Sequence, residues 1–119
     1  MELNFKRKQK TLIILIDGEI DHHTAKELRK QTESAMIEMG GKNIIYGFEQ
    51  VSFMDSSGIG MLIGRYKQLK AYDGKIALVG ANEKIIEIIR LSGLLNLLPV
   101  FSSVDEALSY TEGRNLDAV

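Results

Sequence analysis

The feature of this sequence that most limits its fold is a regular exchange of strand-like and helix-like stretches. Thr11–Ile16 is an unbroken apolar run of strand length, and Asn43–Phe48 is a second one. Between them, from Ala25 to Met39, apolar side chains recur at spacings of three, four and seven, the spacing of one buried helix face. This order indicates parallel strands joined by right-handed helical crossovers.

The rest of the chain continues the same exchange. The expected elements, in chain order, are a half-exposed edge strand around Leu3 and Phe5, the strand Thr11–Ile16 broken by Asp17-Gly18-Glu19, a helix ended by Gly40-Gly41, the strand Ile44–Phe48, a helix with Ile59–Leu69 as its buried stripe, the strand Lys75–Val79, the helix Glu83–Leu91 capped by Asn82, a short strand at Pro99–Phe101, and a helix from Ser103 to about Glu112. The fold class is therefore α/β: one domain in the order β-β-α-β-α-β-α-β-α, with a mostly parallel sheet, an antiparallel edge strand and about four helices. We expect residues 1–113 to form this domain and residues 114–119 to be a flexible tail.

Composition excludes several classes of function. The 119 residues include no cysteine, which rules out disulfides and thiolate zinc sites, and a net charge of −1 gives no general attraction to nucleic acid. The two histidines, His22 and His23, are adjacent and so do not form a metal-binding pair on one helix face, and we expect no metal. No apolar run reaches the roughly 20 residues of a membrane span, and no secretory signal is visible, so the expected location is cytoplasmic. The basic cluster of Lys6-Arg7-Lys8 and Lys10 is interpreted as a solvated hairpin turn.

Two polar stretches follow neighbouring predicted strands. Asp17–His23 follows one strand, and Glu49–Ser57 follows the next. Because sites in open α/β sheets collect beyond the carboxyl ends of parallel strands, we expect these loops to lie side by side. Asp21 either caps the first helix, contacts a partner, or does both. At the second junction a serine either caps the helix or accepts a phosphate, which free helix N–H groups would tolerate.

The same residues could in principle serve other chemistries. A hydrolase would join Ser56 or Ser57 to His22 or His23, but the Gly-x-Ser-x-Gly elbow is absent and nothing indicates an oxyanion hole. We therefore expect no catalytic residue. Gly58, Gly60 and Gly64 miss the spacing of nucleotide-binding loops, so no cofactor is expected. Close packing of a helix on the sheet is the interpretation of Gly60 and Gly64.

Two strings in the sequence carry a resemblance to a known family. They are Gly18-Glu19-Ile20-Asp21-His22-His23-Thr24-Ala25 and Ser52-Phe53-Met54-Asp55-Ser56-Ser57-Gly58-Ile59-Gly60, the second followed by Leu62-Ile63-Gly64-Arg65-Tyr66-Lys67-Gln68. Together they resemble the anti-sigma factor antagonists of the STAS family, and most of all the anti-sigma F branch found in spore-forming bacteria. The similarity runs over nearly the whole chain and weakens after Ser92.

The resemblance implies a switch rather than an enzyme. In the family, the unphosphorylated antagonist binds an anti-sigma factor that is also a serine kinase, and this frees the sigma factor for transcription. The kinase phosphorylates the first serine of Asp-Ser-Ser-Gly, here Ser56, and thereby switches binding off, while a metal-dependent serine phosphatase restores the active form. The implied partner-binding residues are Asp21, His22, His23, Asp55, Ser56, Ser57 and Gly58. An antagonist of a general stress-response anti-sigma kinase, or a small serine hydrolase using Ser56 and His22, remain the alternatives.

Overall fold

The structure, a computed structural model, describes residues 1–113; the expected tail at 114–119 lies outside the described residues. Its elements are β1 (Glu2–Lys8), β2 (Thr11–Ile20), α1 (His22–Met39), β3 (Asn43–Met54), α2 (Ser56–Lys70), β4 (Ile76–Val79), α3 (Glu83–Leu91), β5 (Val100–Phe101) and α4 (Val104–Thr111). The predicted order of strands and helices is confirmed.

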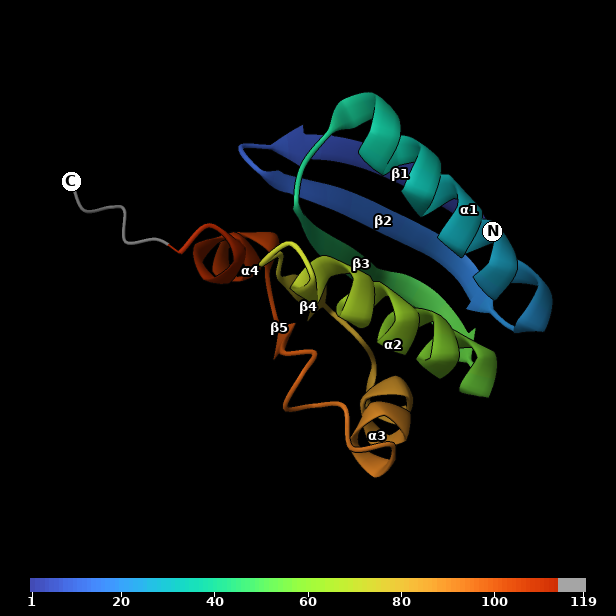
Figure 1. Ribbon diagram of the computed structural model, residues 1–119. Coiled ribbons are helices and arrows are strands. Elements are labelled where there is room, and N and C mark those ends of the chain that lie inside the picture. Colours follow the sequence, from blue (N-terminus) through green and yellow to red (C-terminus); the bar gives the residue numbers. More distant parts are fainter. Residues whose placement is uncertain (114–119) are drawn as a thin grey trace.

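The strands form a five-stranded sheet in the order β1-β2-β3-β4-β5, with β1 antiparallel to β2 and the other neighbours parallel. Three helices, α1 to α3, each connect one parallel strand to the next. Because right-handed crossovers that advance in one direction all pass over the same face, these three helices share one side of the sheet, and α4 covers part of the other (Figure 1).

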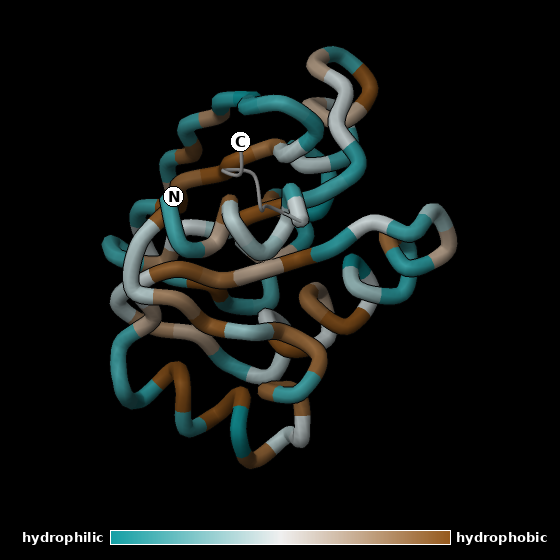
Figure 2. The backbone as a smooth tube through the Cα atoms, turned by 90° about the vertical axis from the view of Figure 1, so that its left-hand side faces the viewer, coloured by the Kyte–Doolittle hydropathy of each residue, from teal (hydrophilic) through white to brown (hydrophobic). Residues whose placement is uncertain are grey.

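The core lies on both faces of the central strands, which are the most hydrophobic part of the backbone trace (Figure 2). In β2, Leu12, Ile14 and Ile16 belong to the cluster packed against α1, α2 and α3. Ile13 points to the opposite face, where it packs with Ala107 and other residues under α4. The alternation along β2 therefore supplies both layers, as expected for a strand buried on two sides.

The two long strands differ from the prediction. We expected β2 to break at Asp17 and β3 to end at Phe48, but they continue to Ile20 and Met54. Backbone pairing between them persists through shifts in register, which absorb the polar residues, and Ile20 and Met54 are buried. Each expected loop therefore shrinks to one residue between strand and helix.

The basic cluster also differs from expectation. Lys6–Lys8 lies within β1 rather than in a turn, and the hairpin turn falls on Gln9 and Lys10, with Gln9 at φ 53°. Arg7 donates through Nη1 to the Met39 carbonyl at 2.7 Å, so the end of β1 is tied to the end of α1.

Across the described residues, no helix combines the length and hydropathy needed to cross a bilayer.

Candidate functional site

Asp21 stands between β2 and α1 and caps the helix. Its carboxylate accepts hydrogen bonds from the backbone N–H of His23 at 3.0 Å and of Thr24 at 2.9 Å. The Thr24 hydroxyl accepts in turn from the Asp21 N–H at 2.8 Å, which completes a capping box. These bonds, led by the one from the Thr24 backbone, favour the charged form and hold the pKa of Asp21 below its usual value.

Asp55 plays the same part between β3 and α2. Its carboxylate accepts from the Ser57 N–H at 2.8 Å, and its carbonyl accepts from the Gly58 N–H at 3.0 Å. The helix cap at this junction is therefore an aspartate. Of the two roles expected for a serine here, capping the helix or accepting a phosphate, the capping role is therefore filled by Asp55.

The two caps lie at the same edge of the sheet. Ile20 and Met54, the last residues of β2 and β3, are paired in register, and the Asp55 N–H donates to the Ile20 carbonyl at 3.1 Å. Parallel pairing therefore sets the two helix N-termini side by side, as the sequence predicted. Each terminus concentrates unpaired N–H groups and partial positive charge there.

Ser56 is the first residue of α2 and is exposed. Within the described chain its hydroxyl makes no hydrogen bond, so a modifying enzyme would not have to break one. Ser57 is half-buried and lines a hollow of about 360 Å³ with His22, Lys26 and other residues of both helices. The two serines therefore differ in access, although they are adjacent in sequence.

The three glycines of α2 have different surroundings. A Cβ on Gly58 would lie 2.4 Å from Cγ and 2.6 Å from Sδ of Met54, so only glycine lets the first turn sit directly on the end of β3. The interpretation of Gly60 and Gly64 as close-packing positions is wrong: apart from the adjacent residues and backbone of α2 itself, no atom lies within 4 Å of a Cβ built at either one. Both face the outer side of α2, where they line the groove beside α1.

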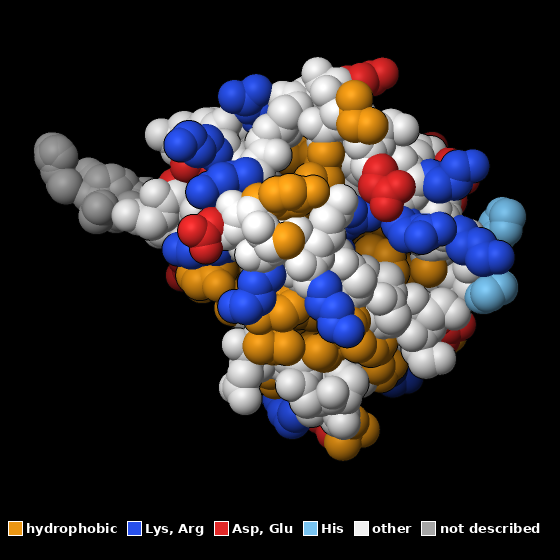
Figure 3. Space-filling view, viewed as in Figure 1, with side chains coloured by type: hydrophobic (Ala, Val, Ile, Leu, Met, Phe, Trp, Pro, Cys, Tyr) orange, Lys and Arg blue, Asp and Glu red, His pale blue; other side chains and the backbone are white. Residues whose placement is uncertain are grey.

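His22 and His23 are exposed in the first turn of α1, and Figure 3 shows the two histidines projecting at one end of the molecule beside Lys and Arg side chains. Among the described residues neither imidazole hydrogen-bonds Ser56 or Ser57, so the nucleophile–base contact of a serine hydrolase is not formed. The same residues contain no group of three or more His, Cys, Asp or Glu placed to hold a metal ion.

Sequence reasoning missed three contributors to this edge. Thr24 completes the capping box, and the spacing Asp-x-x-Thr carried that signal. Lys26 and Arg29 put positive charge into the hollow between α1 and α2. Nothing local marked these two residues, because their position depends on how α1 packs beside α2.

Comparison with known proteins identifies the fold. The STAS domain family matches residues 2–107. The anti-sigma F factor antagonist of Paenibacillus polymyxa is 30% identical over 112 residues, covering 94% of this chain and 96% of the relative. The anti-sigma-B factor antagonist of Staphylococcus aureus is 30% identical over 102 residues, covering 84% of this chain and 94% of the relative.

Solved structures of similar fold agree with this family assignment. The unphosphorylated form of the anti-sigma factor antagonist SpoIIAA matches with a TM-score of 0.81 and 28% identity, covering 97% of this chain and 100% of SpoIIAA. The phosphorylated form of the Bacillus protein SpoIIAA matches with a TM-score of 0.72 and 29% identity, covering 92% and 98%. With its sheet order, its paired helix caps and these relatives, the chain belongs to the STAS domain family of anti-sigma factor antagonists.

Proposed function

We propose that this protein binds an anti-sigma factor that is also a serine kinase, and that phosphorylation of Ser56 ends the binding. The unphosphorylated protein would occupy the anti-sigma factor and release the sigma factor. A metal-dependent serine phosphatase would then restore the binding form. The cytoplasm, where sigma factors act, is the proposed location.

The observation that carries the proposal is that Asp55 caps α2, which leaves the hydroxyl of Ser56 without a structural role in the cap. Asp55 caps α2, and Ser56 at the next position is exposed with its hydroxyl unbonded in the described structure. A phosphate on Ser56 would add about −1.5 to −2 charges and three acceptor oxygens beside a helix N-terminus, where free N–H groups favour anions. We therefore expect modification to leave the fold intact.

Local charge is large enough to switch binding. Two like charges about 4 Å apart repel by roughly 4 kcal/mol at an effective dielectric near 20. Since about 1.4 kcal/mol is tenfold in affinity, one acidic side chain of the partner facing phosphorylated Ser56 would weaken binding by about a thousandfold.

Site-mapped mass spectrometry after incubation with the cognate kinase and ATP tests the assignment. Ser56→Ala should fold, resist phosphorylation and still bind the kinase, whereas Ser56→Asp should fold and bind poorly. Ser57→Ala is the matched control and should still be phosphorylated at Ser56. Phosphate on Ser57, or modification of Ser56→Ala to the wild-type extent, would refute the assignment.

The partner-binding role proposed for Asp21 needs a variant that spares the helix cap. Asn caps helices about as well as Asp but carries no charge, so Asp21→Asn separates docking from capping. We expect Asp21→Asn to weaken kinase binding while the melting temperature changes little. Unchanged affinity in Asp21→Asn, together with a lower melting temperature in Asp21→Ala, would leave Asp21 with its capping role alone.

Two other functions can be tested directly. The similarity to an anti-sigma-B factor antagonist favours a general stress-response kinase as the second candidate partner. Binding titrations against an anti-sigma F and an anti-sigma B factor would discriminate between the two. A hydrolase would instead turn over small esters with a rate abolished in Ser56→Ala, and we expect no such turnover.

A further inference from the structure

Three hollows follow one another along the groove between α1 and α2. The first, of about 360 Å³, is lined by Ser57, the second, of about 370 Å³, by Gly64, and the third, of about 470 Å³, by Tyr72. Neighbouring hollows share lining residues, since Gly60 lines the first two and Gln68 lines the last two. The hollows therefore form one groove, which starts at the capped N-termini of the two helices and ends past the last turn of α2.

The end of this groove nearest Ser56 is basic. Lys26 and Arg29 line its first hollow, no Asp or Glu of the described residues does so, and neither cation forms an ion pair within that part of the chain. Figure 3 shows Lys and Arg side chains extending from the two histidines toward the middle of this face. Asp21 and Asp55 precede the two helices, but their carboxylates accept from helix N–H groups. This end of the groove therefore attracts acidic groups.

The middle hollow combines a floor without side chains and a buried cation. Gly60 and Gly64 lie one helical turn apart, and a Cβ on either would meet no atom within 4 Å outside the adjacent residues and backbone of α2. Arg65 lines the same hollow at 3% exposure, and its Nε is the one buried side-chain nitrogen or oxygen of the described residues that lacks a hydrogen-bond partner. The Glu33 carboxylate stands 3.6 Å from Nη2, beyond hydrogen-bonding distance. The charge of Arg65 is therefore only partly compensated, which favours an acceptor from outside.

The far end of the groove is mainly apolar. Met36, Ile37 and Tyr72 line the third hollow, where Ile37 is 84% exposed and Tyr72 is 60% exposed. The charged residues of this lining, Glu33 and Lys42, are of opposite sign. Large apolar side chains exposed in one hollow favour burial against a partner. The groove therefore changes from basic to apolar along its length.

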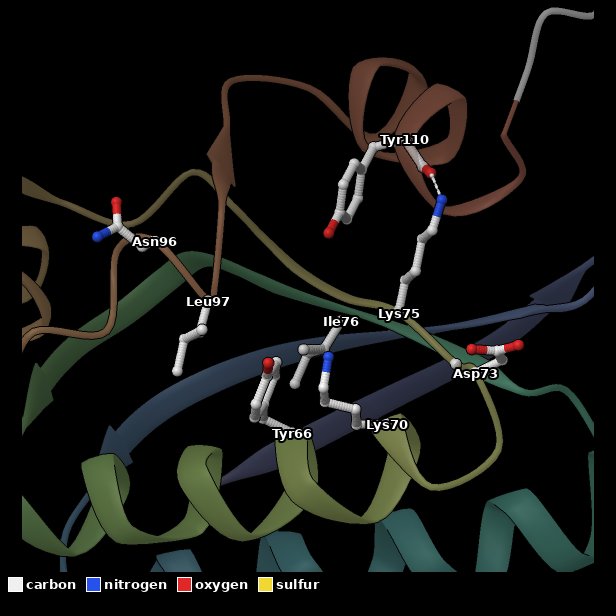
Figure 4. Close-up of a pocket in the computed structure, with 9 residues that line it drawn as sticks. Tyr66, Lys70, Asp73, Lys75, Ile76, Asn96, Leu97 and Tyr110 are labelled. Atoms are coloured by element: carbon white, nitrogen blue, oxygen red, sulfur yellow. Dashed lines mark hydrogen bonds between the residues drawn. The ribbon is translucent and has the colours of Figure 1, made fainter.

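The hollow on the side of α2 away from α1 lacks this graded character (Figure 4). It has a volume of about 270 Å³, and its lining includes Lys70, Lys75 and Asp73. Lys75 donates through Nζ to the Tyr110 carbonyl at 3.3 Å, which directs its ammonium away from Lys70. These charges do not converge on one ligand, so the two lysines supply a control for net charge.

Building on the proposed function, we propose that the groove receives an amphipathic helix of the anti-sigma factor, acidic at the end beside Ser56 and apolar at the end beside Tyr72. The 15 residues of α2 make the groove about 22 Å long, the length of about four helical turns. The absence of side chains at Gly60 and Gly64 lets a third helix approach closely, as in other helix-in-groove complexes. A phosphate on Ser56 would repel the acidic end of that helix, which supplies the acidic partner group that the switch requires.

A synthetic helical peptide of about four turns is the probe, with Glu at the groove-facing positions of its first half and Leu at those of its second half. Two-dimensional ¹H–¹⁵N NMR titration of the labelled protein should give saturable shifts confined to amides of residues 22–37 and 57–72. A peptide of the same composition, with Glu and Leu alternating at these positions, should bind about tenfold more weakly. Absence of saturation, shifts elsewhere or equal binding of the two peptides would overturn the proposal.

Variants of the groove test the same contacts. Gly64→Leu places a side chain on the open floor, so it should fold and bind the peptide about tenfold more weakly. Lys26→Gln/Arg29→Gln should weaken binding similarly because it removes the basic end. Lys70→Gln/Lys75→Gln changes the net charge equally on the other side of α2 and should bind like the wild type. Equal weakening in both double variants, or a folded Gly64→Leu protein that binds like the wild type, would overturn the proposal.

Titration with the anti-sigma factor itself separates failure of the groove assignment from failure of the proposed function. Gly64→Leu should bind the anti-sigma factor about tenfold more weakly than the wild type does. A wild-type protein that is neither bound nor phosphorylated on Ser56 would refute the proposed function, and with it the partner named for the groove. A wild-type protein that is bound and phosphorylated on Ser56, beside a folded Gly64→Leu protein bound equally well, would overturn the groove assignment alone.

Discussion

Adding one methyl group at two neighbouring glycines of α2 should change the stability in opposite directions. At Gly58 the new Cβ would lie 2.4 Å from Cγ of Met54, more than 1 Å inside the roughly 3.5–4.0 Å at which carbon atoms attract. Met54 is 1% exposed and Ile20, the other neighbour, is fully buried, so neither can move aside without disturbing the core. At Gly60 the same methyl group meets no atom within 4 Å outside the adjacent residues and backbone of α2.

These contacts set the magnitudes. Overpacking a core costs about 1–3 kcal/mol, and replacing a helical glycine by alanine returns up to about 1 kcal/mol, so Gly58→Ala should lose about 1–2 kcal/mol. Gly60→Ala has only the favourable contribution and should gain about 0.5–1 kcal/mol. For a domain of this size, 1 kcal/mol corresponds to a shift in melting temperature of about 4 °C.

Urea unfolding followed by circular dichroism, together with thermal melts, measures both variants against the wild type. The refuting results are specific. A Gly58→Ala protein as stable as the wild type would mean that α2 does not sit on the end of β3. A destabilised Gly60→Ala protein would mean that the outer face of α2 is covered by something other than solvent.

Two further predictions concern the cap of α1 and a buried pair of hydroxyl groups. Because the pKa of Asp21 is lowered by folding, its charged form stabilises the protein above the unfolded pKa of about 3.9, and this contribution is lost as the pH falls through the folded value. Acid titration of unfolding from about pH 5 to pH 2 should therefore cost Asp21→Asn less stability than the wild type; identical acid profiles would contradict the lowered pKa. Tyr46 and Thr32 share a buried hydrogen bond of 3.0 Å between their hydroxyls, and burial raises the pKa of Tyr46. Tyr46→Phe should lose about 1–3 kcal/mol in denaturant unfolding because the Thr32 hydroxyl is left unpaired, and the double variant with Thr32→Val should recover part of that loss; a double variant weaker than both single ones would contradict the pairing.

Much of the fold could be predicted because the decisive signals are local. The apolar runs and the helical spacing between them set the order of strands and helices, and Asn82 and Ser103 cap α3 and α4 as expected, each accepting from the N–H three residues on. The spacing Ser103-x-x-Glu106 is that of a capping box, in which the Glu106 carboxylate would accept from the Ser103 N–H. This carboxylate accepts instead from the backbone and hydroxyl of Ser102, so the choice between adjacent serines depended on how the chain enters α4.

The candidate site likewise has features that the sequence predicts and features that it does not. The sequence predicts strand-to-helix junctions at Asp21, Asp55 and Ser56. A polar residue between an apolar strand run and a helical run is expected at the start of the helix. The lengths of β2 and β3 did not follow, since a polar run such as Asp17–Glu19 continues as strand only when a neighbouring strand supplies backbone partners.

By itself, then, the sequence determined the alternation of elements, the capping residues and the family to which the chain belongs. These properties depend on residues within a few positions of one another. Only the tertiary structure decided that Asp55 rather than a serine caps α2, and that Gly58 and not Gly60 meets the sheet. Each of these depends on which distant segment packs against the residue, and a pattern read along the chain does not contain that information.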